Sequence, residues 1–172
     1  MAGISNPAAS GTGDPNEILI NITTSPVSVT YIYTLTANGC NSIAYNVSVI
    51  VNPTPTLTST LTPPAICSNT VFSYTPASGV SGVTFGWVRV AVAGISNPAS
   101  SGTGDPNETL INTTTAPVNV TYEYILIANG CTSLASYNVV VAVNPIPALT
   151  SSLTPPDICS NTVFSYVPAS TT

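Results

Sequence analysis

Residues 118–126 read VNVTYEYIL, and residues 27–35 read VSVTYIYTL. In both stretches every second side chain is apolar, from a valine through two tyrosines to a leucine. Successive side chains of a β-strand point to opposite faces, so this alternation predicts a strand with one face in a core. The positions between them mix polar and apolar side chains, which is typical of a face toward solvent. Both stretches are therefore predicted to be strands.

These two strands belong to a long internal repeat. Residues 2–21, AGISNPAASGTGDPNEILIN, recur as AGISNPASSGTGDPNETLIN at 93–112. In the same way LTPPAICSNTVFSYTPAS at 61–78 recurs as LTPPDICSNTVFSYVPAS at 153–170. The offset is 91 or 92 residues, which is the length of a small domain rather than of one solenoid turn. The chain is therefore predicted to be a tandem array of modules of about 91 residues.

Proline-rich stretches divide the array. VNPTPTLTST at 51–60 and VNPIPALTSS at 143–152 hold the backbone extended, because the residue before a proline is restricted to extended conformations. We predict that residues 1–53 are the C-terminal part of a preceding module and that residues 54–145 are one complete β-sandwich module. Residues 146–172 are then the N-terminal part of a following module.

Both ends of the chain fall inside a predicted module, so we expect the chain to be part of a longer protein. The alternative is that the two partial ends complete each other between copies. Joined in this way, they would lack the counterpart of residues 81–92, SGVTFGWVRVAV, which contain the only tryptophan. Such a gap in a core costs several kcal/mol, so the sequence favours the longer chain.

The predicted fold class is all-β. Helical periodicity is absent, and the sequence places about seven short strands in each module, with a tryptophan in the middle and a tyrosine-rich strand late in the chain. This order is typical of a two-sheet sandwich of the immunoglobulin-like type. The aromatic residues expected in its core are Phe85, Trp87, Tyr122, Tyr124 and Tyr137.

Composition excludes several classes of function. Charged residues make up 4% of the chain, against about 25% in ordinary soluble domains, and there is no histidine and one basic residue, Arg89. Without histidine or lysine, most general-base and nucleophilic mechanisms are excluded, so we expect no enzyme activity. A net charge of −5 excludes ordinary nucleic-acid binding. No apolar run approaches the roughly 18–20 residues of a spanning helix, so we expect no membrane insertion.

Four of the six acidic residues lie in one repeated loop, GTGDPNE, as Asp14 and Glu17 and again as Asp105 and Glu108. Their oxygens are weak candidates for a calcium site, because Ca²⁺ takes six to eight ligands and each loop supplies two carboxylates. The sequence favours turn formation and an ion pair instead, with Arg89 paired to Asp105 or Glu108. No other cofactor is expected.

The four cysteines, Cys40, Cys67, Cys131 and Cys159, are too widely spaced for a zinc site. Isolated cysteines in a chain of this composition indicate extracellular disulfides. The simplest bridge joins Cys67 to Cys131 within the complete module, and the alternative joins Cys131 to Cys159. An immunoglobulin-like topology could place Cys67 and Cys131 at opposite ends of the sandwich, which leaves the pairing open.

The order AICSNTVFSYTPAS, then TFGWVRVAVAGISNPASSGTGDPNETLINTTTAPVNVTYEY, then ANGC and YNVVVAVNP resembles the PKD-like repeats of very large surface proteins of Bacteroidota-type bacteria. The resemblance covers essentially the whole chain, as one full copy and two partial ones. It implies an extracellular, cell-surface protein built from tandem immunoglobulin-like sandwiches, and it implies no catalytic residue.

Two functions follow as hypotheses. The first is a non-catalytic stalk or spacer of an extracellular adhesin or surface filament, whose partners are neighbouring copies of the same module. The second is an adhesive binding module that recognises carbohydrate or a cell-surface partner. The solvent exposure of the rings of Trp87, Tyr122 and Tyr124 separates them, because sugar-binding sites present exposed aromatic side chains.

Overall fold

The computed structural model describes residues 2–171, which form strands, turns and loops and no helix. The chain forms strands because it is rich in β-branched and aromatic residues, and Pro, Gly and Asn between them favour turns. The strands in chain order are β1 (Val27–Tyr33), β2 (Thr36–Ala37), β3 (Cys40–Asn41), β4 (Tyr45–Val51), β5 (Ile66–Cys67), β6 (Thr70–Phe72), β7 (Thr84–Arg89), β8 (Ser100–Thr103), β9 (Glu108–Leu110), β10 (Val118–Ala128), β11 (Cys131–Thr132) and β12 (Tyr137–Asn144).

The described residues form two compact units. One comprises the residues up to Ser59 together with Pro76–Gly86 and Ile125–Ser136. The other comprises Thr60–Thr75, Trp87–Tyr124 and the residues from Tyr137 onward. The domain boundaries expected after residues 53 and 145 stay a prediction.

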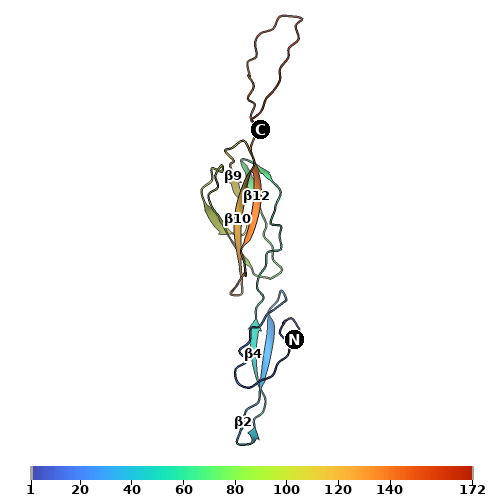
Figure 1. The fold of residues 1–172 in the computed structure, drawn as a ribbon, viewed down its shortest axis with the longest axis vertical. Helices are drawn as coiled ribbons and strands as arrows, with labels where there is room; N and C mark the ends of the chain where they lie inside the picture. The colour runs from blue at the N-terminus through green and yellow to red at the C-terminus, as the bar shows by residue number, and fades with distance from the viewer. Residues whose placement is uncertain (1, 172) are drawn as a thin grey trace. The chain divides into compact units, whose positions relative to one another are not determined.

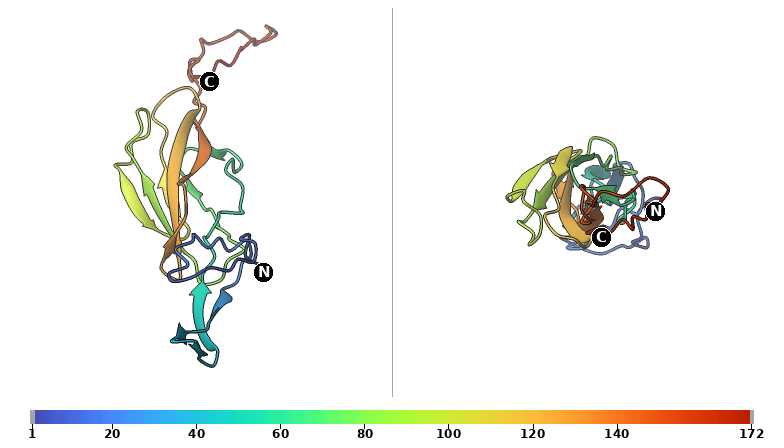
Figure 2. Two further views of the ribbon diagram at one scale, coloured as in Figure 1. Left: turned by 60° about the horizontal axis from the view of Figure 1, so that its bottom comes forward. Right: turned by 90° about the horizontal axis from the view of Figure 1, so that it is seen from above.

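The largest sheet has the strand order β5-β12-β10-β7-β8, and β11 pairs with β10. Its two longest strands, β10 and β12, run antiparallel side by side, with partners from Val118 and Val143 to Tyr124 and Tyr137 (Figures 1 and 2). β5 joins the edge of β12 in the parallel sense, with Cys67 beside Asn144. β5 and β12, which are far apart in the sequence, are therefore neighbours in this sheet.

The second layer is the antiparallel pair β6-β9, which runs from Thr70 beside Leu110 to Phe72 beside Glu108. The ring of Phe72 stacks on the ring of Tyr122 from β10, with centroids 5.1 Å apart. The core therefore lies between β6-β9 and the larger sheet. The fold is all-β and immunoglobulin-like, as predicted from the alternation of apolar residues.

Three of the five predicted core aromatics are buried: Trp87 is 6% exposed, and Tyr122 and Tyr124 are 0% exposed. Phe85 and Tyr137 are only half-buried, which corrects the prediction. Phe85 is the second residue of β7, and Tyr137 is the first residue of β12. Both side chains point to the same face of their strand as the buried residues. Near the end of a strand, however, a side chain has fewer neighbours in the facing layer.

The unit that contains β1 and β4 has a different pattern of exposure. These two strands pair antiparallel over seven residues, as β10 and β12 do. Tyr45, Val47 and Val49 on β4 repeat Tyr137, Val139 and Val141 of β12, yet they are 50%, 53% and 42% exposed. On β1 only Val29 is buried, at 1% exposure. The predicted parity of these strands is present, but the predicted burial is only partial.

Asn-Gly pairs close two short hairpins. In the hairpin that joins β2 to β3, Asn38 has φ 51° and Gly39 has φ 81°, and Ala37 pairs with Cys40 across the turn. Such a two-residue turn requires a positive φ at both central positions, which Asn and Gly tolerate best. The repeated ANGC sequence therefore determines the hairpin in both copies.

Candidate functional site

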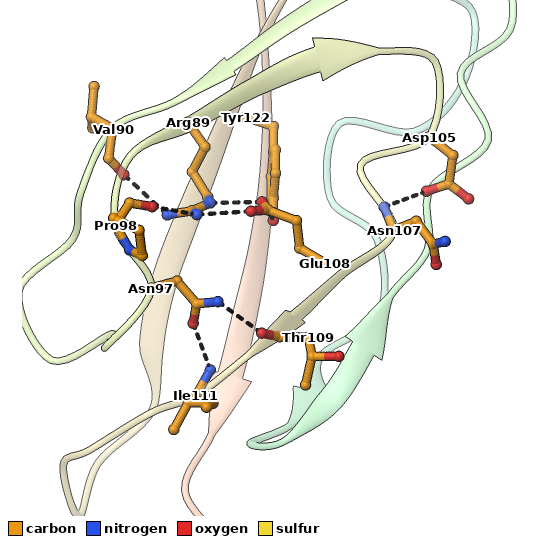
Figure 3. Close-up of polar contacts among 10 residues, drawn as sticks. All are labelled: Arg89, Val90, Asn97, Pro98, Asp105, Asn107, Glu108, Thr109, Ile111 and Tyr122. Carbon is orange, nitrogen blue, oxygen red and sulfur yellow. Dashed lines mark hydrogen bonds and ion pairs between the residues drawn. The ribbon is translucent and has the colours of Figure 1, made fainter.

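A buried charged cluster lies between β7, β9 and β10 (Figure 3). Arg89 is the last residue of β7 and shares the inward parity of Trp87, so its guanidinium enters the core and the residue is 1% exposed. Glu108 is the first residue of β9. Arg89 Nε lies 2.8 Å from Glu108 Oε2, and Nη2 lies 2.9 Å from Oε1. The two parallel hydrogen bonds form a bidentate ion pair, which is the strongest geometry for these groups.

The remaining polar atoms of the cluster also have partners. Arg89 Nη2 donates to the carbonyl of Pro98 at 2.7 Å, and Nη1 donates to the carbonyl of Val90 at 3.4 Å. The hydroxyl of Tyr122 donates to Glu108 Oε2 at 2.8 Å. This matters because a buried charge without partners is strongly destabilising. The cluster is thus internally satisfied.

The contacts shift the pKa values of the cluster in the direction that keeps the ion pair charged. The hydrogen bond from Arg89 holds the pKa of Glu108 below its ordinary value, against the opposing effect of burial, and the hydroxyl of Tyr122 lowers it further. The same hydrogen bond raises the pKa of Arg89. Burial first, and then the bond to Glu108, raises the pKa of Tyr122. None of these groups is placed to exchange a proton near neutral pH.

Asp105, the other predicted partner of Arg89, pairs elsewhere. Its carboxylate accepts from Ser73 Oγ at 2.6 Å, from the backbone N–H of Tyr74 at 2.8 Å and from the backbone N–H of Asn107 at 3.1 Å. Burial raises the pKa of Asp105, but these three hydrogen bonds outweigh it and the pKa is lowered. The predicted ion pair of Arg89 is therefore made by Glu108, and Asp105 joins its loop to Ser73 and Tyr74, which follow β6.

In the first copy of the repeated loop, Glu17 accepts a hydrogen bond from the hydroxyl of Tyr31 at 2.7 Å. This contact corresponds to that between Glu108 and Tyr122. The bond to Glu17 raises the pKa of Tyr31 to about 12. Asp14 accepts from the backbone N–H of Asn16 at 3.1 Å, which is the turn contact expected of an Asp-Pro-Asn sequence.

Asn112 is a structural residue that the sequence analysis missed. It is 8% exposed, and its Nδ2 donates to the carbonyl of Val143 at 2.7 Å and to that of Ala116 at 2.8 Å. Its Oδ1 accepts from the backbone N–H and the hydroxyl of Thr114, each at 2.8 Å. One side chain thus joins the loop before β10 to the end of β12. The recurrence of Leu-Ile-Asn before a Thr-rich loop was the available signal.

Residues 64–147 match the family model of the PKD-like domain. The matched segment begins just before β5 and ends just after β12, so it contains the whole sandwich and the charged cluster. No curated protein matches the chain. PKD-like domains are structural or binding modules of surface proteins, generally without catalytic activity, and they typically occur in extracellular proteins.

All four cysteines are free in the structure, which corrects the predicted bridges. In the PKD-like segment Cys67 lies beside Asn144, whose neighbour Val143 pairs with the first residue of β10. Cys131 pairs with Ala128, the last residue of the same 11-residue strand. A disulfide requires Cα atoms within about 7 Å, whereas a strand of this length spans roughly 30 Å. Neither this bridge nor the alternative to Cys159 is present.

The four acidic residues named as calcium candidates do not gather into one site. Within residues 2–171 no three His, Cys, Asp or Glu side chains lie close enough together to hold a metal ion. In the PKD-like segment the carboxylate oxygens of Asp105 and Glu108 accept hydrogen bonds from protein donors. A calcium ion would have to compete with those donors for the same oxygens.

The surface beside the charged cluster carries an open hollow of about 280 Å³. Arg89 contributes to its lining, but this guanidinium is 1% exposed and already bonded to Glu108. Ligand sites usually combine a deeper cavity with polar groups left free to bind. The hollow is lined by Val88, Arg89, Val90, Ala99, Ser100 and Ser101.

The described part of the chain contains no helix with the length and hydrophobicity needed to cross a bilayer.

Proposed function

We propose that the chain is a non-catalytic spacer within an extracellular surface protein, in which PKD-like modules follow one another in tandem. The match of residues 64–147 supports a structural or binding module, and the 91- to 92-residue repeat supports the tandem arrangement. Neighbouring copies of the same module are then its partners, and an adhesin or a surface filament is the kind of protein that it extends.

The observation that carries this proposal is the parallel contact between the first and last strands of the PKD-like segment. Cys67 on β5 lies beside Asn144 on β12, and the N–H of Ser68 donates to the carbonyl of Asn144 at 2.7 Å. A second bond joins the N–H of Val140 to the carbonyl of Leu61 at 2.9 Å. A pull on the two ends of the segment draws parallel neighbours in opposite directions, so these bonds are loaded together in shear.

The buried aromatic rings favour the spacer over the binding module. Trp87, Tyr122 and Tyr124 are at most 6% exposed, so they are not available to stack on a sugar. They pack on one another and on Phe72 and Tyr74 instead, with Trp87 edge-on to Tyr122 at 5.5 Å and Tyr74 against Tyr124 at 5.5 Å. Such pairs add about 0.5–1.5 kcal/mol each to the stability of a core.

The test is single-molecule force spectroscopy on the full chain, held by handles at its two ends. We expect one abrupt unfolding event that releases up to about 290 Å of contour length, since the 84 residues from 64 to 147 span that distance at about 3.4 Å per residue. Gradual extension without such an event would contradict the spacer role.

A matched pair of variants tests the parallel contact between β5 and β12. Ser68→Pro removes the N–H that donates to Asn144, so we expect a lower unfolding force. Ser160→Pro places the same substitution at the repeated position outside the PKD-like segment, and we expect the unfolding force to be unchanged. The fluorescence of Trp87, the only tryptophan, shows whether each variant has kept its core. If Ser68→Pro does not fold, the unfolding force of the natural chain alone tests the spacer role.

A further inference from the structure

One compact unit of the structure contains segments from both copies of the repeat. It comprises the residues up to Ser59 together with Pro76–Gly86 and Ile125–Ser136, which belong to the PKD-like segment. The proline-rich stretch 51–60, which divides the two copies, leads from one to the other. Its contacts within this unit show what one copy presents to the next.

The proline-rich stretch is held at both of its ends. At its start, Asn21 Nδ2 donates to the carbonyl of Val51 at 2.7 Å, which ties the end of β4 to the first copy. Further along, the N–H of Thr58 donates to the carbonyl of Ala77 at 2.8 Å, which ties the stretch to the PKD-like segment. We call residues 52–57, which lie between these two anchors, the joint.

Two prolines of the joint are buried. Pro53 is less than 2% exposed, and Pro55 is buried as well. A linker that moves freely in solvent keeps its side chains exposed, so the burial of both rings indicates a packed connection. Proline also fixes its own φ and restricts the residue before it to extended conformations. The backbone of the joint therefore has few ways to bend.

The Asn-Gly turn between β10 and β11 offers the joint a hydrogen-bond acceptor. Asn129 has φ 49° and Gly130 has φ 78°, and Ala128 pairs with Cys131 across the turn. A turn of this kind uses the carbonyl of its first residue and the N–H of its fourth. The carbonyl of Asn129 lies between them in the sequence, so the hairpin leaves it available to another segment.

Asn52 in the joint binds that carbonyl. Its Nδ2 donates to the carbonyl oxygen of Asn129 at 3.1 Å, although the two residues are 77 apart in the sequence. A second contact joins the same two copies. A Cβ atom at Gly79 would come within 3.1 Å of Cγ2 of Thr24, so the loop before β7 lies against the loop before β1 at this point.

The donor and the acceptor of the hydrogen bond recur at the period of the repeat. Asn-Gly occurs at 38–39 and 129–130, and Val-Asn-Pro occurs at 51–53 and 143–145. The hairpin accounts for Asn-Gly, because its turn needs a positive φ at both residues. The residue before a proline needs only an extended backbone, so local structure does not account for the asparagine of Val-Asn-Pro. The contact with the turn does.

We propose that the Asn-Gly turn of a PKD-like module is the docking surface for the module that precedes it in the chain, and that the asparagine of Val-Asn-Pro is the residue that docks. The joint is then a stiff connection instead of a free hinge. One exposed hydrogen bond is weak by itself. A linker this short keeps donor and acceptor at a high effective concentration, so a weak contact is enough to hold the joint closed.

This inference rests on the proposed tandem spacer and says how its neighbouring modules meet. The end-to-end distance of a flexible chain grows only with the square root of its length, whereas that of a stiff chain grows in proportion to it. Docking at each joint thus extends the reach of a spacer without adding residues.

The test is nuclear magnetic resonance of the full chain under reducing conditions. Residual dipolar couplings report whether β1 and β4 share one alignment tensor with the PKD-like segment, as they do only when the joint is stiff. We expect a single tensor for the natural chain. Asn52→Asp keeps the size of the side chain but replaces the donor by a carboxylate oxygen that faces a carbonyl. We expect that variant to need two separate tensors.

The matched control is Asn144→Asp, which makes the same substitution at the repeated position, away from this joint. It should keep the single tensor of the natural chain. The fluorescence of Trp87 shows whether each variant has kept the core of the PKD-like segment.

Gly79→Thr tests the second contact independently. Thr171 occupies the repeated position, and Gly79 does not have a positive φ, so the loop itself accepts a threonine. The new side chain should push the two loops apart and divide the alignment into two tensors. Adding Thr24→Ala removes the methyl group that it would meet, and should restore the single tensor.

Three results would overturn the proposal. The first is two separate tensors in the natural chain, which shows a free hinge. The second is a single tensor in Asn52→Asp as in Asn144→Asp, which shows that the side chain does not hold the joint. The third is a Gly79→Thr chain that Thr24→Ala does not restore. None of them bears on the force measurement, because the unfolding of residues 64–147 depends on β5 and β12 and not on the joint. A chain without an abrupt unfolding event would, in turn, leave the alignment result unchanged.

Discussion

The indole of Trp87 lies directly on the backbone of Gly102. A Cβ atom at residue 102 would come within 2.8 Å of Cζ2 of Trp87 and 3.0 Å of Cε2, closer than real Cβ contacts. Trp87 Nε1 is buried and has no hydrogen-bond partner among the described residues. β8 can therefore approach β7 at this point only because residue 102 has no side chain.

We predict that Gly102→Ala destabilises the PKD-like segment by about 1–3 kcal/mol, because the indole has to move within a packed core. Urea unfolding followed by the fluorescence of Trp87 measures the change. Gly11, at the repeated position, has no atom within 4 Å of its built Cβ, so Gly11→Ala is the control and should leave the midpoint unchanged. Equal stability of the two variants would contradict this account of the contact.

Removing one partner of the buried ion pair should cost more than removing a comparable exposed carboxylate. Arg89→Met leaves the carboxylate of Glu108, which is 16% exposed, without its cation, and we expect a loss of about 1–3 kcal/mol. Glu17→Gln is the comparison, because Glu17 has the same place in the repeat as Glu108 but accepts hydrogen bonds only from Asn6 and Tyr31 within residues 2–171. We expect its effect to be well under 1 kcal/mol. Chemical unfolding with fluorescence and circular dichroism measures both.

Stability should fall in acid. The pKa values of Glu108 and Asp105 are lower in the folded chain than in the unfolded one, so folding is favoured by their ionised forms. That stability is complete above the unfolded values of about 4 and is lost as pH falls through the lowered folded values. Thermal melting between pH 7 and pH 2 should show the decline, and Glu108→Gln should show a shallower one. A flat profile would rule out both contributions.

Stability should also fall in strong alkali. Burial raises the pKa of Tyr122 and of Tyr124 in the folded chain, so folding favours their neutral forms. Their contribution is complete below the unfolded value of about 10 and decreases as pH rises above it. Ultraviolet titration of tyrosinate should show a fraction of the tyrosines ionising only together with unfolding. If all tyrosines ionise near pH 10 while the core fluorescence is unchanged, the two rings are not buried as described.

The free cysteines predict that reducing agents do not affect stability. No disulfide constrains the chain, so the melting temperature should be the same with and without reductant. Cys40, Cys67 and Cys159 are exposed and should react with a thiol reagent in the folded chain, and Cys131, which is half-buried, should react more slowly. A drop in melting temperature on reduction would show that a bridge forms in solution.

Local sequence determined a large part of this protein. Alternating apolar residues over 118–126 predicted β10 and its buried tyrosines, and the same alternation over 27–35 predicted β1. These features depend on the two-residue period of a strand and on turns such as Asn-Gly, which are properties of neighbouring residues.

The tertiary structure decided which side chains are actually buried and which partners they take. Val47 and Val139 have the same place in the same sequence pattern, yet one is 53% exposed and the other 0%, because burial depends on the layer that faces the strand. Arg89 pairs with Glu108 and not with Asp105, three residues earlier in the same loop, because β9 carries Glu108 to the end of β7. Cys67 and Cys131 stay apart because the strand order places them near opposite ends of β10. Contacts between distant segments are set by strand order and register, which no local pattern encodes.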